Sequence, residues 1–318
     1  MGDFPVVFVD HEFPDEYRDL VDGRLEVVGG ASDVGLDRAD AILAGAVRRW
    51  DAVAFALAPR ARLISRVGVG YDNVVVADAI AAGMVVCNTP QAPAVSTAEH
   101  TVALLLAVTK HLPRHTRRAR EGLPGEKVGV ALELDGRVLG LLGIGRIASR
   151  VAAAAQGLGM DVIATDPGVD ASPVPGVELV QFDELLARSD VVTLHVSYSD
   201  ATRHLIGATE LARMRPHAVL VNTSRGGLVD EAALLHALAT DALGGAALDV
   251  LDGEPAITPD HPVLRAAATD DRLLVTPHLG GNTAESFRRT EVFLAHRVVD
   301  ALRRAAPVPS APGPGPRP

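Results

Sequence analysis

The sequence VLGLLGIGRIA, residues 138–148, joins an apolar strand to the start of a helix through two glycines. Gly143 permits a tight turn, Gly145 lets the backbone approach a pyrophosphate, and the small Ala148 lets the helix and the strand pack closely. The free amide groups at the start of the helix, together with the helix dipole, attract an anion. This order of strand, glycine turn and helix predicts a dinucleotide-binding unit.

The residues that follow complete this pattern. The next strand ends in Asp166, 21 residues after Gly145. A carboxylate there accepts hydrogen bonds from the adenosine ribose and repels a 2′-phosphate, which favours NAD over NADP. Five apolar residues at helical spacing predict the face of the intervening helix that packs on the sheet: Ile147, Val151, Ala154, Ala155 and Leu158.

A second glycine pair, Gly68-Val69-Gly70, also follows a strand and precedes a helical segment. Its next strand ends at Asn88 rather than at an acid, and the larger Asn73 stands three positions beyond Gly70. We therefore assign the pyrophosphate to residues 143–148.

Short apolar strands alternate with helical segments along the chain, which predicts an α/β fold with parallel sheets. Several strands are apolar throughout, as expected where helices cover both faces of a sheet, so we expect two doubly wound domains. The predicted strands are Val6–Asp10, Leu25–Gly29, Leu63–Val67, Met84–Asn88, Arg137–Gly143, Asp161–Asp166, Val191–Val196, Ala218–Ser224 and Leu273–His278.

Two long helices organise the predicted domains. The first, from Ser96 to about His115, joins them, with a boundary near Pro93–Ala98. The second, Thr283–Arg304, returns the chain to the first domain, with Phe287, Leu294, Val298 and Leu302 on one face. The domains are then 1–98 plus 287–305, and 99–286. Six prolines in the last twelve residues predict a disordered tail over 306–318.

Composition excludes several classes of protein. The chain has 318 residues with 30 Lys and Arg against 40 Asp and Glu, a net charge of −10, so we expect no nucleic-acid partner. The densest apolar run, Val102–Val108, is far shorter than the roughly 20 residues that cross a bilayer, so we expect no membrane partner. The single cysteine and the lack of a signal-type opening predict a cytoplasmic protein.

Three residues are candidates for the chemistry that accompanies a nicotinamide cofactor, which needs a cation, a histidine and a carboxylate. Ligands of doubly wound sheets bind beyond the carboxyl ends of the strands. Arg225 follows the strand that ends at Ser224, Glu254 lies beyond Ala247-Leu248-Asp249-Val250, and His278 follows Leu274-Val275-Thr276-Pro277. His195 also ends a strand, where it either borders the cofactor or has a structural role. We expect no metal site.

The chain resembles the D-isomer-specific 2-hydroxyacid dehydrogenases, which include D-3-phosphoglycerate, D-lactate, glyoxylate/hydroxypyruvate, formate and phosphite dehydrogenases. The resemblance covers about residues 60–290. The motifs that carry it are GVGYDN at 68–73, GIGRI at 143–147, NTSRGGLVD at 222–230, ALDV at 247–250 with Glu254-Pro255, and TPHLGG at 276–281.

This resemblance implies a flavodoxin-like substrate-binding domain, a Rossmann NAD-binding domain and a site between them. Arg225 would pair with the carboxylate of a small anionic substrate, His278 would exchange the proton of the C2 hydroxyl, and Glu254 would favour the protonated imidazole. Amides of Val69 and Gly70 would help to hold the carboxylate.

The resemblance also implies a cofactor site. The NAD-binding residues would be Thr97, Gly143, Gly145, Arg146 and Ile147 around the pyrophosphate, Asp166 at the ribose, Thr223 and Arg225 toward the nicotinamide, and Asp249 at its carboxamide. His195, His278 and Gly280 would be further contacts of the cofactor. The family is usually dimeric through the Rossmann domain, which implies a homodimer.

Departures from the family pattern leave the substrate open. Val75 stands where relatives often carry Asp, and the first 60 residues, which help to shape the pocket, match least clearly. Two alternatives therefore remain: oxidation of phosphite or a phosphonate on the same scaffold, and a non-catalytic NAD(H) sensor that acts as a corepressor.

Overall fold

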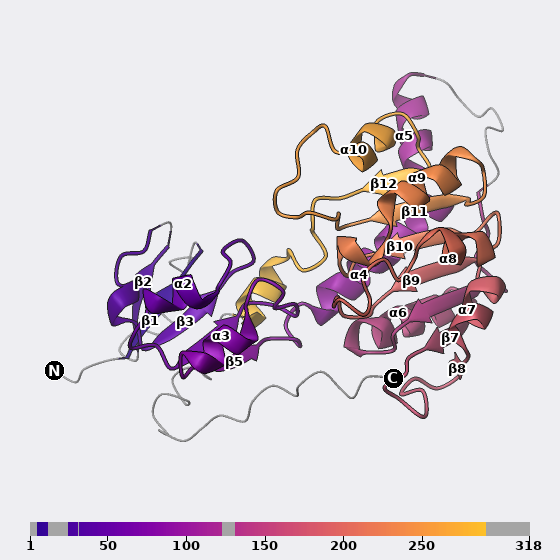
Figure 1. Cartoon of the computed structure of the whole chain (residues 1–318). Helices are drawn as coiled ribbons and strands as arrows, with labels where there is room; N and C mark the ends of the chain where they lie inside the picture. The colour runs from indigo at the N-terminus through magenta and orange to yellow at the C-terminus, as the bar shows by residue number, and fades with distance from the viewer. Residues whose placement is uncertain (1–4, 12–24, 31, 123–130, 291–318) are drawn as a thin grey trace. The chain divides into compact units, whose positions relative to one another are not determined.

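The structure, a computed structural model, describes residues 5–11, 25–30, 32–122 and 131–290 (Figure 1). The chain divides into two compact units, Met1–Pro93 with Asn282–Pro318, and Ala94–Gly281. Both division points lie five residues before the predicted domain ends at 98 and 286. The first shift arises because the helix α4 (Ala94–Thr109) packs on strands of the second unit. The predicted tail, 306–318, lies outside the described residues.

The first unit has a parallel five-stranded sheet in the order β2-β1-β3-β4-β5. This is the flavodoxin-like order, as expected. Its elements are β1 (Val6–Val9), β2 (Glu26–Gly29), η1 (Leu36–Arg38), β3 (Ala41–Ala44), α2 (Ala52–Ala56), β4 (Leu63–Arg66), α3 (Val76–Ala81) and β5 (Val85–Asn88). Strand β3 is missing from the prediction because a buried run of four residues, two of them alanine, has no periodicity that distinguishes strand from helix.

The second unit has a parallel seven-stranded sheet in the order β12-β11-β10-β9-β6-β7-β8. Counted from β6, this is the Rossmann order with one added strand, so the predicted fold class is confirmed. Its strands are β6 (Val138–Leu142), β7 (Asp161–Thr165), β8 (Glu178–Leu179), β9 (Val191–Leu194), β10 (Val219–Asn222), β11 (Gly245–Leu248) and β12 (Leu273–Val275). The order reverses between β6 and β9, where such sheets bind their ligands.

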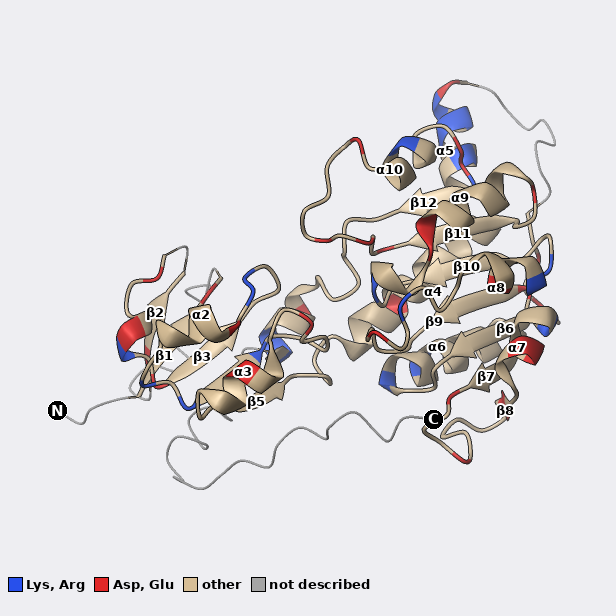
Figure 2. Cartoon of the chain, viewed as in Figure 1, with Lys and Arg blue, Asp and Glu red and all other residues tan. Residues whose placement is uncertain are grey.

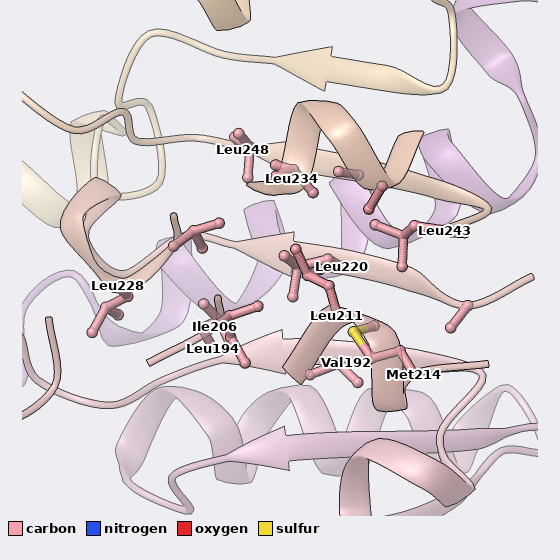
Figure 3. Close-up of a cluster of buried hydrophobic side chains, with 14 of the residues drawn as sticks. Val192, Leu194, Ile206, Leu211, Met214, Leu220, Leu228, Leu234, Leu243 and Leu248 are labelled. Carbon is pink, nitrogen blue, oxygen red and sulfur yellow. The ribbon is translucent and has the colours of Figure 1, made fainter. Parts of the chain in front are cut away.

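Helices cover both faces of this sheet (Figure 1). The helices of this unit are α4, α5 (Leu112–Arg120), α6 (Arg146–Gly157), α7 (Phe182–Arg188), α8 (Ala208–Arg213), η2 (Gly226–Leu228), α9 (Glu231–Ala239) and α10 (Pro262–Ala267). One face carries a cluster of buried aliphatic side chains from β9, β10, β11, α8 and α9, including Leu194, Leu220 and Leu248 (Figure 3). Each fully buried leucine contributes roughly 1.5–3 kcal/mol to folding.

Two of the predicted helices differ in the structure. The joining helix is two helices, because His111 adopts a left-handed conformation at φ 50° and separates α4 from α5. The buried face of α6 consists of Ala148, Val151, Ala152 and Ala155, whereas Ala154 and Leu158 are exposed. Small residues face inward because α6 packs on α4 as well as on the sheet.

The C-terminal helix is described only from residue 284 to residue 290. Within it, Phe287 is exposed rather than buried. The other predicted apolar positions, Leu294, Val298 and Leu302, lie outside the described residues.

Basic residues gather on α5, whose ribbon is largely blue in Figure 2. Arg117 forms a two-pronged ion pair with Asp271.

In the described part of the chain, no helix is both long enough and apolar enough to cross a membrane.

Asp190, just before β9, is buried and joins three segments at the amino ends of the strands. Its carboxylate accepts a hydrogen bond from the Val138 amide at 2.9 Å, and it contacts Arg215 at 3.0 Å and His217 at 2.8 Å. Burial alone would raise the pKa of Asp190, but these hydrogen bonds outweigh it and hold the pKa below its ordinary value.

We expect Asp190→Asn to lower the free energy of unfolding by about 1–3 kcal/mol at neutral pH, because it removes charged hydrogen bonds from a buried site. A lowered pKa in the folded state adds stability that is present above the unfolded pKa and is lost as the pH falls, so the difference between the proteins shrinks toward pH 3. Urea unfolding across this pH range measures it. Asp183→Asn, which removes an exposed pair with Arg213, is the control and costs at most about 1 kcal/mol; equal effects of the two changes contradict the account.

Candidate functional site

The turn after β6 has the shape that a bound pyrophosphate requires. Gly143 has φ 89°, and a Cβ atom there would lie 3.0 Å from the carbonyl oxygen of His195, so only glycine fits without strain. At Gly145, the first residue before α6, a Cβ atom would meet nothing within 4 Å. No side chain caps this helix start, so its first amide groups have no side-chain acceptor. These residues fit the phosphates of a dinucleotide.

Asp166 follows β7, the strand next to β6 in the sheet. Its carboxylate accepts hydrogen bonds from the Ile144 amide at 3.0 Å and the Gly168 amide at 2.9 Å. Asp166 therefore fixes the glycine turn and keeps oxygen lone pairs for a ribose hydroxyl.

His195 follows β9, on the other side of the Gly143 turn. Burial lowers the pKa of His195 to about 3, so the imidazole is neutral at physiological pH. Its Nε2 lies 3.2 Å from the Thr193 hydroxyl, and its amide donates to the Leu142 carbonyl. A neutral ring at this point borders the turn without adding charge.

The turn that carries Arg225 follows β10 and is held by its own residues. The buried Asn222 donates to the Arg225 carbonyl at 2.8 Å and accepts from the Ser224 amide at 3.0 Å. The Ser224 hydroxyl donates to the Leu194 carbonyl at 2.7 Å, and the Arg225 guanidinium donates to the Ser224 carbonyl. The backbone direction at Arg225 is therefore fixed before any ligand binds.

Glu254 and His278 follow the neighbouring strands β11 and β12, and the structure brings them together. Glu254 Oε2 lies 2.6 Å from Nδ1 of His278, and Glu254 Oε1 accepts the Leu251 amide at 2.8 Å. His278 has φ 55°, a conformation uncommon outside glycine, and its amide donates to the Asp249 carbonyl. Backbone strain of this kind marks functional sites. With Nδ1 engaged, Nε2 is the ring nitrogen left for a substrate.

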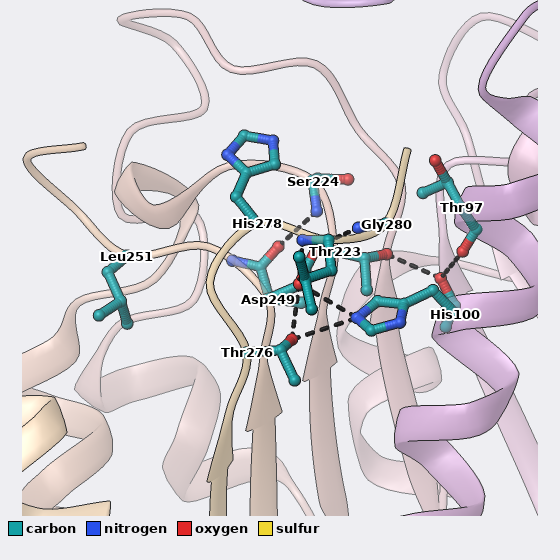
Figure 4. A network of polar contacts seen from close by, with 12 residues as sticks. Thr97, His100, Thr223, Ser224, Asp249, Leu251, Thr276, His278 and Gly280 are labelled. Atoms are coloured by element: carbon teal, nitrogen blue, oxygen red, sulfur yellow. Dashed lines mark hydrogen bonds and ion pairs between the residues drawn. The ribbon is translucent and has the colours of Figure 1, made fainter. Parts of the chain in front are cut away.

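Asp249 holds the loop that carries His278 (Figure 4). Its buried carboxylate accepts hydrogen bonds from the Thr276 hydroxyl at 2.6 Å and the amides of Leu279 and Gly280 at 2.8 Å. His100 reaches from α4 and places Nε2 3.1 Å from the same carboxylate. Burial would raise the pKa of Asp249, but these bonds outweigh it and keep the carboxylate ionised.

Three threonines of the second unit complete this network of polar contacts. Thr101 donates its hydroxyl hydrogen to the Thr97 carbonyl at 2.7 Å, so Thr223, 2.8 Å away, donates to Thr101. Thr97 also lies close to Gly280, where a Cβ atom would be 3.3 Å from its methyl group. Figure 4 shows Thr97, Thr223 and Gly280 in the same network of polar contacts as Asp249.

The remaining predicted residues belong to the start of α6 and to the first unit. Arg146 is exposed and Ile147 half-buried at the start of α6. Val69 and Gly70 belong to the first unit, in the loop after β4, where Asn88 donates to the Val69 carbonyl at 2.7 Å. Across the described ranges, no group of three or more His, Cys, Asp or Glu side chains is placed to hold a metal ion.

The sequence reasoning missed His100, whose contact with Asp249 spans 149 residues. The only local signal is the ionisable pair Glu99-His100, in a helix whose other residues are Ala, Val, Leu, Ser and Thr. The sequence alone does not distinguish this histidine from a polar residue on a helix surface, because its partner is distant in sequence.

Gly226, directly after Arg225, packs against the turn that carries Glu254. A Cβ atom at Gly226 would overlap the backbone of Leu251 and Asp252, which cannot move without shifting Glu254. We expect Gly226→Ala to destabilise the protein by about 1–3 kcal/mol in chemical denaturation, the cost of overpacking. Gly157→Ala, at the open end of α6, is the control and is neutral or stabilising. A neutral Gly226→Ala would show that the two turns are not in contact.

Comparison with known proteins gives a consistent picture. Residues 102–280 match the family model described as the NAD binding domain of D-isomer specific 2-hydroxyacid dehydrogenases. The chain is 38% identical over 241 residues to a hydroxypyruvate reductase of Thermotoga maritima, covering 76% of this chain and 78% of that protein. It is 37% identical over 274 residues to a D-3-phosphoglycerate dehydrogenase of Archaeoglobus fulgidus, covering 86% of this chain but about half, 51%, of that protein.

Solved structures agree with these relatives. A glyoxylate reductase from Paecilomyes thermophila superposes with a TM-score of 0.87 at 27% identity, covering 97% of this chain and 98% of that one. A D-lactate dehydrogenase from Aquifex aeolicus, solved with NAD and lactic acid, has a TM-score of 0.83 at 29% identity, covering 94% and 96%. The prediction that NAD is the cofactor is confirmed by the matched NAD-binding family.

Proposed function

We propose that this chain, which belongs to the D-isomer-specific 2-hydroxyacid dehydrogenase family, transfers hydride between NAD and C2 of a small D-2-hydroxy acid or 2-oxo acid. The observation that carries the proposal is the Glu254–His278 pair at 2.6 Å. It joins the ends of β11 and β12, in the sheet whose β6 turn fits a pyrophosphate. A histidine oriented by a carboxylate is an arrangement that moves protons at neutral pH.

The protein's part in the reaction is to move one proton. The nicotinamide, when bound, supplies or accepts the hydride. His278 gives a proton from Nε2 to the C2 oxygen as the oxo acid is reduced, and takes it back during oxidation. Glu254 stabilises the protonated imidazole through Nδ1 while its second oxygen stays bound to the Leu251 amide.

Arg225 is the proposed anchor of the substrate. Its guanidinium would pair with the substrate carboxylate, a geometry that arginine recognises through two parallel hydrogen bonds. The rigid Asn222–Arg225 turn supports this role, because it fixes the base of the side chain. The amides of Val69 and Gly70 would bind the same carboxylate from the first unit.

The proposed NAD contacts follow the edge of the second sheet. Asp166 after β7 would bind the ribose, and the glycine turn after β6 the pyrophosphate. The other residues proposed to contact NAD are Thr97, Gly143, Gly145, Arg146, Ile147, His195, Thr223, Arg225, Asp249, His278 and Gly280. A cytoplasmic location and a homodimer stay predictions.

The reaction class is tested by NADH oxidation, followed by absorbance, with glyoxylate, pyruvate, hydroxypyruvate, phenylpyruvate, branched 2-oxo acids and 3-phosphohydroxypyruvate. We expect turnover of at least one of these acids. The order of the rates among acids of different size indicates how large a substrate the pocket accepts. Phosphite with NAD is tested in the opposite direction, and turnover there alone favours the phosphite alternative. No turnover of any of these compounds, with NADH binding retained, favours the sensor alternative.

We expect His278→Ala to lower kcat by about 10²- to 10⁴-fold, the usual contribution of a general acid or base. NADH affinity, measured by fluorescence titration, stays within about threefold of wild type, because the imidazole is needed for proton transfer and the other proposed NAD contacts remain. His236→Ala, an exposed histidine of α9, is the matched control. Turnover by His278→Ala near the wild-type rate removes His278 from the mechanism.

We expect Asp166→Ala to weaken NADH binding by about tenfold, the loss of a hydrogen bond to a charged group. NADPH binding changes less, because the repulsion of its 2′-phosphate is removed at the same time. Isothermal titration with both cofactors compares the two losses. Asp166→Asn keeps an acceptor for the Ile144 amide and separates the ribose role from the turn's stability. Equal losses for the two cofactors argue against a ribose contact.

A further inference from the structure

The segment that carries Glu254, which we call the Glu254 turn (residues 251–255), lies outside any helix or strand. Within it, the Leu251 amide reaches Glu254 at 2.8 Å and the Gly253 amide reaches the side chain of Asp252 at 3.1 Å. These local bonds shape the turn but do not fix it to the sheet. Its position therefore depends on contacts with residues outside the turn.

Glu231, the first residue of α9, supplies such a contact. Its Oε1 accepts a hydrogen bond from the Asp252 amide at 2.8 Å. Its Oε2 lies 3.4 Å from Nε2 of His261, the residue that precedes α10. The side chains of Glu231 and His261 are only 15% and 16% exposed. One partly buried carboxylate thus ties the Glu254 turn to α9 and to the start of α10.

The same helix also continues from the Arg225 turn. Arg225 precedes η2, and α9 begins at Glu231, six residues after Arg225. Gly226 packs its backbone directly on Leu251 and Asp252. The Glu254 turn therefore contacts both Glu231 and the segment that carries Arg225. The positions of Arg225 and Glu254 thus both depend on the start of α9.

We propose that ionised Glu231 is a positioning residue. It holds the Glu254 turn in place, and thereby keeps the Glu254 carboxylate within hydrogen-bonding distance of His278. The proposal rests on the proposed function, because it assigns Glu231 a part in the same proton transfer. Glu231 would touch neither the substrate nor the cofactor. It would act through the Asp252 amide alone.

The energetics of Glu231 support a functional role. Burial raises the pKa of Glu231; Asp252 and Glu254 raise it further, and the Asp252 amide and His261 oppose the shift. A carboxyl group whose pKa is raised by folding adds stability below its unfolded pKa and loses it as the pH rises through the folded pKa. At neutral pH its charge therefore costs stability. A carboxylate whose charge destabilises the folded protein is typical of a functional site rather than of one that serves stability alone.

Two variants separate charge from hydrogen bonding. Glu231→Ala removes the acceptor for the Asp252 amide, and Glu231→Gln keeps an acceptor but removes the charge. We expect Glu231→Ala to lower kcat by about ten- to a hundredfold, as small misplacements of catalytic groups do, with the KM for NADH unchanged. We expect a smaller fall in Glu231→Gln. On the acid side, the wild-type rate falls as Glu231 is protonated, and this part of the pH profile is lost in Glu231→Gln.

Two further readouts do not depend on turnover. We expect the Asp252 amide to exchange hydrogen at least about tenfold faster in Glu231→Ala. The Tm of Glu231→Gln at neutral pH equals or exceeds that of wild type, whereas a purely structural glutamate would lower it. Glu210→Gln is the matched control, because Glu210 accepts one backbone amide, that of Gly207, at 3.1 Å and is 21% exposed. It leaves the rate, the pH profile and the Asp252 exchange unchanged.

The outcomes are distinct. A lower kcat with faster Asp252 exchange and an undiminished Tm in Glu231→Gln supports the proposal. Parallel losses of Tm and kcat in Glu231→Gln, or wild-type kinetics in Glu231→Ala, overturn it. If wild type turns over none of the 2-oxo acids, the proposed function fails and the catalytic role fails with it, while the exchange rate still reports whether Glu231 holds the turn.

Discussion

The parallel alignment of the strands in the second unit is the constraint on which the proposed site depends. Because every described strand of this sheet runs in one direction, the segments after β6, β7, β10, β11 and β12 leave from the same edge. Adjacent strands lie about 4.8 Å apart, so Arg225, Glu254 and His278 start from neighbouring points. An antiparallel strand at any of these positions would send its following loop to the opposite edge.

Buried carboxylates in this unit divide into two kinds. For Asp249 and Asp190, hydrogen bonds outweigh the cost of burial and lower the pKa, so their charges hold the fold together. For Glu231, burial dominates and raises the pKa, so its charge opposes folding at neutral pH. The carboxylate that costs stability is the one that supports the Glu254 turn.

The sequence predicts features that depend on local chemistry. The glycine turn at 143–148 and the strands around it follow from backbone sterics and hydrophobic pattern, and both are present. Strand β8, only two residues long, and the break at His111 depend on tertiary packing and were missed. The roles of His100 and Glu231 depend on partners 149 and 21 residues away, which no local pattern reveals.

The most direct test of the central claim follows the hydride itself. A 2-oxo acid that the protein reduces is incubated with NADH carrying deuterium at the transferred position of the nicotinamide, and the product is analysed by mass spectrometry and chiral chromatography. The account predicts one deuterium at C2 and the D configuration wherever that carbon is chiral. A product without deuterium at C2, or with the L configuration, would contradict it.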